Sequence, residues 1–286
     1  MTQLDCLPST ATYRMRFAVL GSSSSGNASV LRMDPLVPGH GGTRQILIDA
    51  GLSAKATRGR LSALGYEFTE TTDILYTHFD MDHARPHWST PVMCHGITVR
   101  CARKHLPLAK ARGLPTQFTH AFEGPFSLPH NIEVTPVDLP HDEAGAVAYR
   151  IKTPAGSIGF ATDLGRVEPS LIEAFEGVDL LAIESNYDHA MQLESPRPAF
   201  LKERIMGGSG HLSNAQALEF VQAISRRRAP NRIVLLHLSR ECNDYRVIEA
   251  LWQKHAPELW SRVVIARPDD GIDVYDSESS ATFPAR

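Results

Sequence analysis

The sequence has few cysteines, no long apolar run and no large excess of charge of either sign, and each shortage excludes a class of protein. Four cysteines with no Cys-x-x-Cys pair are too few for a disulfide-dependent scaffold of 286 residues. The apolar run at residues 17–20 is too short for a signal sequence or a membrane span. A net charge of -3 gives no global attraction to phosphate groups, so nucleic-acid binding would require a local basic patch. We therefore expect a cytoplasmic protein with free thiols and no membrane segment.

The apolar residues that are present form short runs between polar turns, which is typical of strands in a large core. Strands are predicted at 17–20, 29–32, 45–49, 73–77, 132–137, 157–162, 179–184 and 232–237. The small polar residues of 21–27 favour a tight connection between antiparallel strands. Helices are predicted over 53–64 and from the capping box at Ser213, with Arg226, Arg227 and Arg228 at the end of the second helix.

The domain organisation predicted from these runs is simple. Residues 1–14 lack periodicity and are predicted to be a loose N-terminal extension. No Pro/Gly-rich linker divides residues 15–286, so they are predicted to form a single domain of sheet and helix layers.

The most informative stretch is residues 76–83, Tyr-Thr-His-Phe-Asp-Met-Asp-His, directly after an apolar strand. It places His78, Asp80, Asp82 and His83 within six residues. Without a cation the crowded carboxylates would repel one another, and imidazoles and carboxylates are common ligands of zinc, iron and manganese. Because 78 and 80 alternate along the end of the strand while 82 and 83 follow a turn, the spacing predicts two adjacent metal ions.

Two metal ions need further ligands, and His141, Asp163 and His237 each follow a predicted strand. A lone His or Asp at a strand end is usually a structural residue. Together with the dense motif, however, the three predict a shared site where strand ends converge.

The chain resembles the metallo-β-lactamase superfamily, whose pattern is His-x-His-x-Asp-His followed by a distant His, an Asp and a final His. Within it the chain is similar to the bacterial YycJ/WalJ (VicX) group. The matching blocks are 19–27 (Val-Leu-Gly-Ser-Ser-Ser-Ser-Gly-Asn), 47–51 (Leu-Ile-Asp-Ala-Gly), 161–165 (Ala-Thr-Asp-Leu-Gly), 184–186 (Glu-Ser-Asn), 201–205 (Leu-Lys-Glu-Arg-Ile), 210–214 (Gly-His-Leu-Ser-Asn) and 237–239 (His-Leu-Ser). They run from about residue 16 to 245 of the chain.

This resemblance implies an α/β fold, the four-layer αββα sandwich, with two divalent metal ions (Zn, Mn or Fe) at one edge of the sheets. By the resemblance, His78, Asp80 and His141 hold the first metal, Asp82, His83 and His237 hold the second, and Asp163 bridges both. Asp49 matches the family's early Asp, which supports the metal loop by a hydrogen bond. Glu184 and Asn186 are expected to orient ligands or substrate.

One position departs from the family pattern: Asp80 stands where the family usually has His. A carboxylate is a harder donor than an imidazole and adds negative charge. We expect the first site to be weaker for zinc and more favourable to manganese or iron, or to be only partly filled.

The resemblance implies a hydrolase that acts on phosphodiesters, in particular a 5′-to-3′ DNA exonuclease that uses a hydroxide between its metals as nucleophile. Asp82 and His211 are the candidate catalytic residues. His211 resembles a His in related tRNA-processing phosphodiesterases that assists the leaving group, although a structural histidine is the alternative. No Gly-x-Ser-x-Gly nucleophile motif is present.

The substrate remains open at this point. A basic stretch that could follow a nucleic-acid backbone could equally be a solvated face; it comprises Arg100, Arg103, Lys104, His105, Lys110 and Arg112. One alternative is a small-molecule hydrolase of the same fold acting on a cyclic phosphodiester, a lactone or a thioester, which would need a closed apolar pocket rather than a groove with basic rims. Another is a non-catalytic regulatory protein, and an oxidoreductase is less favoured because the chain is too short to add a flavin domain. The oligomeric state is not predicted.

Overall fold

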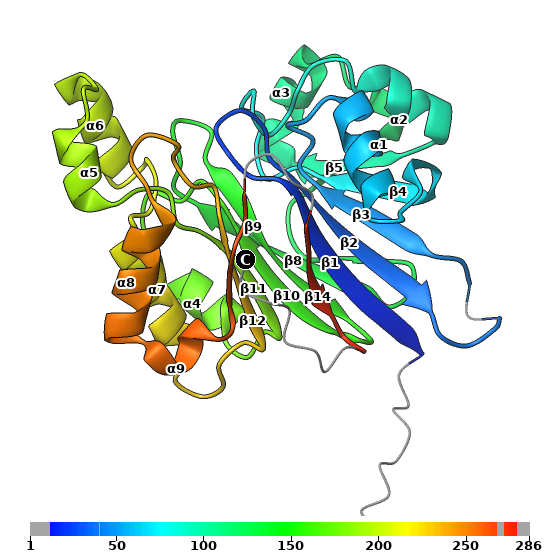
Figure 1. The fold of residues 1–286 in the computed structure, drawn as a ribbon. Coiled ribbons are helices and arrows are strands. Elements are labelled where there is room, and N and C mark those ends of the chain that lie inside the picture. The colour runs from blue at the N-terminus through cyan, green and yellow to red at the C-terminus, as the bar shows by residue number, and fades with distance from the viewer. Residues whose placement is uncertain (1–11, 40, 268–271, 279–286) are drawn as a thin grey trace, which may run out of the picture.

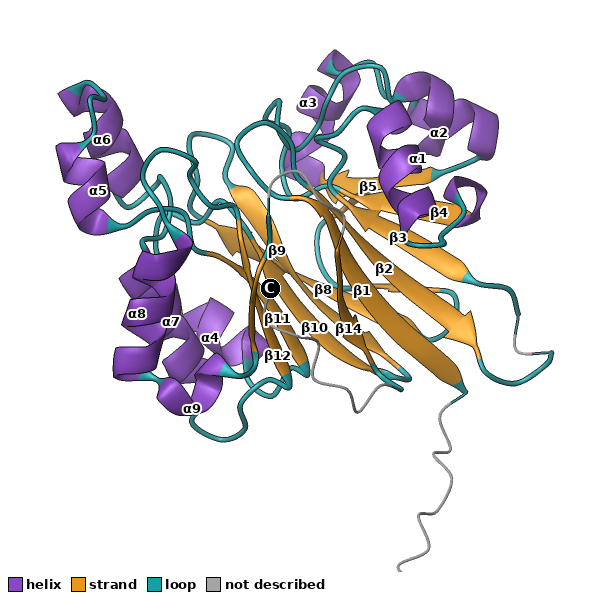
Figure 2. Ribbon diagram, in the orientation of Figure 1, coloured by secondary structure: helices purple, strands orange, loops and turns teal. Residues whose placement is uncertain are grey.

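The computed structural model describes residues 12–39, 41–267 and 272–278, and its centre is a pair of stacked mixed sheets (Figures 1 and 2). The first sheet has the order β14 (Ile272–Asp276), β1 (Tyr13–Gly21), β2 (Ala28–Pro35), β3 (Arg44–Ile48), β4 (Thr71–Leu75), β5 (Thr98–Ala102) and β6 (Thr119–Phe122). The second has the order β13 (Val263–Ile265), β12 (Arg232–Leu236), β11 (Leu180–Glu184), β10 (Gly156–Ala161), β9 (Ala146–Thr153), β8 (Ile132–Leu139) and β7 (Phe126–Leu128).

Helices cover the outer face of each sheet, which gives the αββα layering expected from the resemblance (Figure 2). Over the first sheet lie α1 (Ala54–Ala63), α2 (Ser89–His95) and α3 (Leu106–Ala111). Over the second lie α4 (Pro169–Phe175), α7 (Asn214–Ile224), α8 (Tyr245–His255) and α9 (Pro257–Trp260). Two short helices, α5 (His189–Glu194) and α6 (Ala199–Met206), project away from the sandwich (Figure 1). Short 3-10 turns occupy Phe68–Glu70, Arg103–His105 and Thr116–Phe118.

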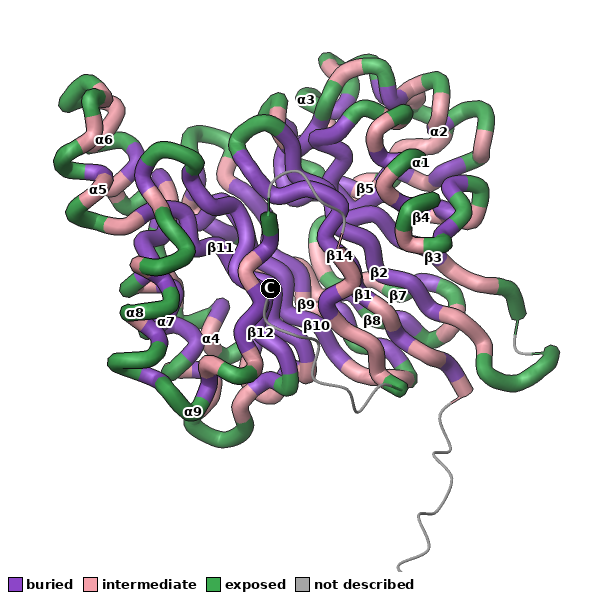
Figure 3. The backbone as a smooth tube through the Cα atoms, in the orientation of Figure 1, coloured by how far each residue is buried: buried purple, intermediate pink, exposed green. Residues whose placement is uncertain are grey.

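Apolar side chains of both sheets meet in one core between them. Phe17 of β1 and Phe160 of β10 are in edge contact there, with ring centroids 6.4 Å apart. The tube view shows the buried backbone of both sheets running through the molecule, while many exposed residues lie on α5 and α6 (Figure 3). Burial of such apolar surface is the main force that stabilises the sandwich.

The predicted strands and helices are all present, with small shifts at their ends. Residues 21–27 connect β1 and β2, which are antiparallel as expected. The Ser213 capping box opens α7, but the helix ends at Ile224, so the three arginines at 226–228 follow it rather than form its last turn.

The first strand begins at Tyr13, four residues earlier than predicted and within the predicted extension. Tyr13 and Arg14, assigned from the sequence to the loose extension of residues 1–14, pair with Pro35 and Asp34 of β2. Tyr13 is buried and its hydroxyl lies 2.9 Å from His130 Nδ1. This long-range partner is invisible to a search for local periodicity. Residues 1–11 of the extension lie outside the described residues, and the single domain over 15–286 stays a prediction.

Three of the four cysteines, Cys94, Cys101 and Cys242, are free thiols, and Cys6 lies outside the described residues. Within the part of the chain described here, no helix is long and apolar enough to cross a membrane.

Candidate metal centre

The site forms at the edge where several strands end. β10, β11 and β12 run parallel, so the segments that follow them leave the second sheet on the same side. β3 and β4 are also parallel in the first sheet. Asp49 follows β3, Asp163 follows β10 and His237 follows β12, with φ angles of 62°, 57° and 57°. Few non-glycine residues adopt this left-handed conformation, and such strain concentrates at functional sites.

The loop after β4 is tied down by backbone hydrogen bonds. Within the loop, the amides of His83 and Ala84 donate to the carbonyl of Asp80, at 3.0 and 2.7 Å. From outside it, Asn27 N–H donates to the carbonyl of Asp82 at 2.7 Å, and Ala50 N–H donates to that of His83 at 2.8 Å. The loop is therefore fixed before any ligand binds.

The predicted ligands separate into two neighbouring groups. His78, His141 and Asp163 form one, and Asp82, His83 and His237 form the other; within each group the ligand atoms lie within 4.8 Å of one another. Asp80 Oδ2 lies 3.9 Å from His78 Nε2 and 4.0 Å from His141 Nε2, so it belongs beside the first group. The chain thus brings together all seven residues that the sequence singled out.

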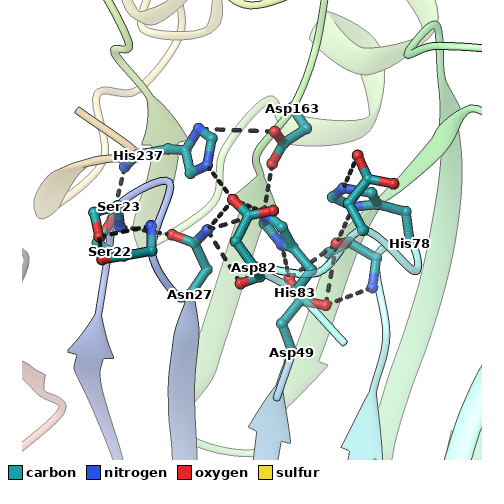
Figure 4. A network of polar contacts seen from close by, with 12 residues as sticks. Ser22, Ser23, Asn27, Asp49, His78, Asp82, His83, Asp163 and His237 are labelled. Atoms are coloured by element: carbon teal, nitrogen blue, oxygen red, sulfur yellow. Dashed lines mark hydrogen bonds and ion pairs between the residues drawn. The ribbon is translucent and has the colours of Figure 1, made fainter. Parts of the chain in front are cut away.

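Asp163 stands between the two groups. Its Oδ2 lies 3.0 Å from His83 Nε2, and its Oδ1 lies 4.0 Å from His141 Nε2. Figure 4 shows Asp163 and Asp82 facing the imidazoles of His83 and His237. One carboxylate therefore reaches both groups through different oxygens.

Asp49 lies behind the site rather than in it. Its Oδ2 is 2.7 Å from His83 Nδ1, and its two oxygens accept bonds from the backbone N–H and the hydroxyl of Thr77 (Figure 4). This contact directs Nε2 of His83 toward Asp163. The arrangement is the carboxylate–histidine support that metal-binding imidazoles usually have.

Glu184 supports two further histidines in the same way. Its Oε1 lies 2.7 Å from His211 Nδ1 and 3.0 Å from His237 Nδ1, and its Oε2 accepts N–H bonds from Leu164 and Leu212. Asn186 donates to the backbone carbonyl of His237 at 2.7 Å. The side chains of Glu184 and Asn186 therefore hold histidines in place, and their predicted role in orienting ligands or substrate stays a prediction.

The donor set fits a divalent cation. Nε2 of buried His78 has no hydrogen-bond partner in the described chain and points into the first group. Burial, with His83 nearby, holds the pKa of His78 well below its usual value. Burial also lowers the pKa of His237, but Asp163 and the hydrogen bonds to Asp82 and Glu184 outweigh it and raise that pKa to about 10. A metal ion would replace such protons, because it binds neutral imidazole and ionised carboxylate.

A cavity of about 490 Å³ lies over these ligands. His211, Asp80, Asp82, His141, Asp163 and His237 are among its lining residues, and Arg197 and Arg204 lie on its walls. Arg204 pairs with Asp142, and Arg197 with Glu241. The cavity therefore combines an acidic floor with walls that carry arginine–carboxylate ion pairs.

The sequence did not single out several contacts of the site. Ser22 accepts the backbone N–H of His237 at 2.6 Å, and Asn27 Nδ2 lies 3.2 Å from Asp82 Oδ2 (Figure 4). Both belong to the Ser/Gly-rich connection at 21–27, which was interpreted as a turn. The available signal was that this connection lies within the matching family block at 19–27.

The basic stretch does not border this cavity, although all of its members are described. Arg100 pairs with Asp73, Arg103 with Glu123 and Lys104 with Asp138. His105 is buried against backbone carbonyls. The solvated-face interpretation fits these residues better than a nucleic-acid track.

Sequence and structure comparisons agree with this geometry. Residues 44–238 match the model of the beta-lactamase superfamily domain. The chain is 28% identical over 237 residues to exodeoxyribonuclease YycJ of Bacillus anthracis, which covers 80% of this chain and 84% of that protein. It is 27% identical to exodeoxyribonuclease WalJ of Streptococcus pneumoniae, with 80% and 83% covered.

The fold also matches solved structures. The metallo-beta-lactamase fold protein YhfI of Bacillus subtilis superposes with a TM-score of 0.63 at 15% identity, covering 91% of this chain and 99% of that chain. The chain therefore belongs to the beta-lactamase superfamily and is a hydrolase of the metallo-β-lactamase fold, similar to YycJ and WalJ.

Proposed function

We propose that the chain is a phosphodiesterase that uses two divalent metal ions and shortens DNA from its 5′ end. The observation that carries this proposal is the convergence of seven carboxylate and imidazole side chains from four strand ends, five of which line the floor of one cavity. The names of the curated relatives support DNA as the substrate. Free thiols at three cysteines are compatible with a cytoplasmic location.

His78, Asp80 and His141 would hold the first ion, Asp82, His83 and His237 the second, and Asp163 both. Zinc, manganese and iron all suit this donor set. When bound, two such cations supply an activated water and neutralise charge on the attacked phosphate.

The chain's own residues prepare the site for this chemistry. Asp49 and Glu184 fix the rings of His83 and His237, and Asp82 contacts both of their Nε2 atoms, at 3.6 and 3.3 Å. His211 is held through Nδ1 by Glu184, so its Nε2 is the atom that donates a proton to the leaving oxygen. The Glu184 carboxylate, against the opposing effect of burial, raises the pKa of His211 and so favours the protonated form.

The test is hydrolysis of end-labelled single- and double-stranded DNA and RNA by purified protein in manganese or zinc. The Asp82→Ala/His83→Ala double variant is the control, because both residues belong to the second group of ligands. We expect stepwise shortening of 5′-labelled DNA by the wild type and none by the variant. If metal-loaded wild type cuts no nucleic acid, the nuclease proposal is wrong and a small phosphodiester, lactone or thioester becomes the substrate to test.

A further inference from the structure

We propose that Arg85 and His87 line a second arm of the cleft, which binds the phosphates of a nucleic-acid strand next to the phosphate that is cut. This inference rests on the proposed function, and it adds a binding site in a cavity that shares Asp82 with the first cavity but includes no residue of α6, which lines part of the first.

A second cavity of about 310 Å³ adjoins the metal centre. Its lining residues are Ser24, Ser25, Met81, Asp82, Arg85, Pro86 and His87. Ser24 and Asp82 also line the cavity over the ligands, so the two spaces meet at a predicted metal ligand. A bound strand can therefore occupy both spaces, with the phosphate that is cut at the metal centre between them.

Arg85 differs from the arginines of the first cavity. Arg197 and Arg204 each form an ion pair with a carboxylate. In the segments for which the structure gives coordinates, the exposed guanidinium of Arg85 has neither an ion pair nor a hydrogen bond, while its backbone N–H donates to Ala50 at 3.0 Å. A guanidinium whose N–H donors have no partner, on a backbone that is held in place, is suited to bind phosphate oxygens.

Other groups of the second cavity suit the same ligand. Ser24 and Ser25 bring hydroxyls, and Arg240 Nη2 lies 3.4 Å from the hydroxyl of Ser25. Met81 is 56% exposed and offers an apolar surface on which a base can pack. The second cavity thus places the Arg85 guanidinium beside the acidic floor, where a polymer of phosphates extends and a single small phosphodiester does not.

The experiment measures binding of a fluorescent phosphorothioate oligo-dT of about 12 nucleotides, a length within the range that single-strand-binding grooves cover. Its linkages resist hydrolysis, so binding is separated from cutting. We expect Arg85→Ala to weaken binding about fivefold at low salt and to make the log–log salt dependence shallower by about 0.7. Arg85→Lys should restore most of the affinity, because it keeps the charge.

Arg227→Ala is the matched control. It removes one exposed arginine, which lies beyond the C-terminal end of α7 and pairs with Glu176. Its affinity should equal that of the wild type, and all variants should share one unfolding temperature. Equal affinity of Arg85→Ala and wild type, equal weakening by Arg227→Ala, or absence of binding by the wild type would each overturn the proposal. Arg85-dependent binding without hydrolysis of any nucleic acid would instead leave the second arm standing and refute the nuclease function.

Discussion

At the scale of single residues, Asp80 is the position where this chain leaves its family pattern. Its side chain is 55% exposed and lies beside His78 and His141 at 3.9 and 4.0 Å. Because zinc prefers the softer imidazole, we predict that Asp80→His raises zinc affinity at the weaker site about tenfold or more. Zinc titration against a chelating dye, with metal analysis of the purified protein, measures the change.

Asp138→His is the control for Asp80→His, since it places the same substitution at an exposed aspartate of another cavity. It should leave zinc affinity unchanged. Purified wild type with two tightly held zinc ions per chain would refute the idea that Asp80 weakens the first site.

His211 allows a second test at this scale. If it protonates the leaving oxygen, His211→Ala should lower the rate of DNA hydrolysis by about 10²–10⁴-fold and leave metal content unchanged. The loss should be much smaller with bis-p-nitrophenyl phosphate, whose leaving group needs little protonation. Loss of metal from the variant would instead identify His211 as a ligand. This outcome is worth checking because His211 Nδ1 lies 3.5 Å from Asp163 Oδ1.

The sequence predicts the ligand residues far better than the residues that support them. His78, Asp80, Asp82 and His83 stand out because four donors within six residues have few structural explanations. Asn27 and Ser22 have no such local signal. They act on residues 55 and 215 positions away: the order of strands in the first sheet brings Asn27 to Asp82, and the packing of the two sheets brings Ser22 to His237.

At the scale of elements, the connection after β3 packs directly against the loop after β4 that carries Asp82. A Cβ on Gly51 would lie 1.7 Å from the backbone carbonyl oxygen of Asp82. We predict that Gly51→Ala lowers the free energy of unfolding by about 1–3 kcal/mol and weakens metal binding, because the loop must move. Urea denaturation with metal chelated, followed by metal titration, measures both effects.

Gly59 in α1 is the matched control for Gly51, since a Cβ there meets no atom within 4 Å. Gly59→Ala should raise the free energy of unfolding by about 0.5–1 kcal/mol, because alanine is the better helix former. Destabilisation by both substitutions, or by neither, would contradict the role given to the contact between Gly51 and the loop.

Elements with a strong local pattern are the ones that the sequence predicts. β11 and β12 are continuous apolar runs, and α7 has both a capping box and an apolar face. β5 and β14 are among the strands that the sequence does not predict: they are as long as β11 and β12, but both interleave polar or charged residues with apolar ones. β14 pairs with β1, more than 250 residues earlier, which no local window can contain.

At the scale of the whole molecule, this pairing joins the two ends of the described chain. Arg14 of β1 donates to Asp276 of β14 from Nε at 2.9 Å, and also from Nη2. The contact adds an ion pair to the edge of the first sheet. It joins residues 262 positions apart, so the two strands near the ends of the described chain stabilise the sandwich together.

The link between the ends predicts how stability depends on pH. The hydrogen bond from Arg14 lowers the pKa of Asp276 against the opposing effect of burial, and the backbone N–H of Glu278 lowers it further. A carboxylate whose pKa is lower in the folded chain than in the unfolded chain stabilises the fold at every pH above its unfolded pKa, which is about 3.9. It loses this effect as the pH falls through its folded pKa.

Asp276→Asn should therefore lower the free energy of unfolding at pH 7 by no more than about 1 kcal/mol, since Arg14 is partly exposed and solvent screens the pair. The difference from wild type should shrink below about pH 4, as protonation makes the two side chains equally neutral. Urea denaturation of both proteins from pH 3 to pH 7 measures this difference in the free energy of unfolding. The effect of protonating the acidic metal ligands cancels, because both proteins carry them. A difference that stays constant with pH would mean that Asp276 acts through its shape and not through its charge, and that the ends are joined by strand pairing alone.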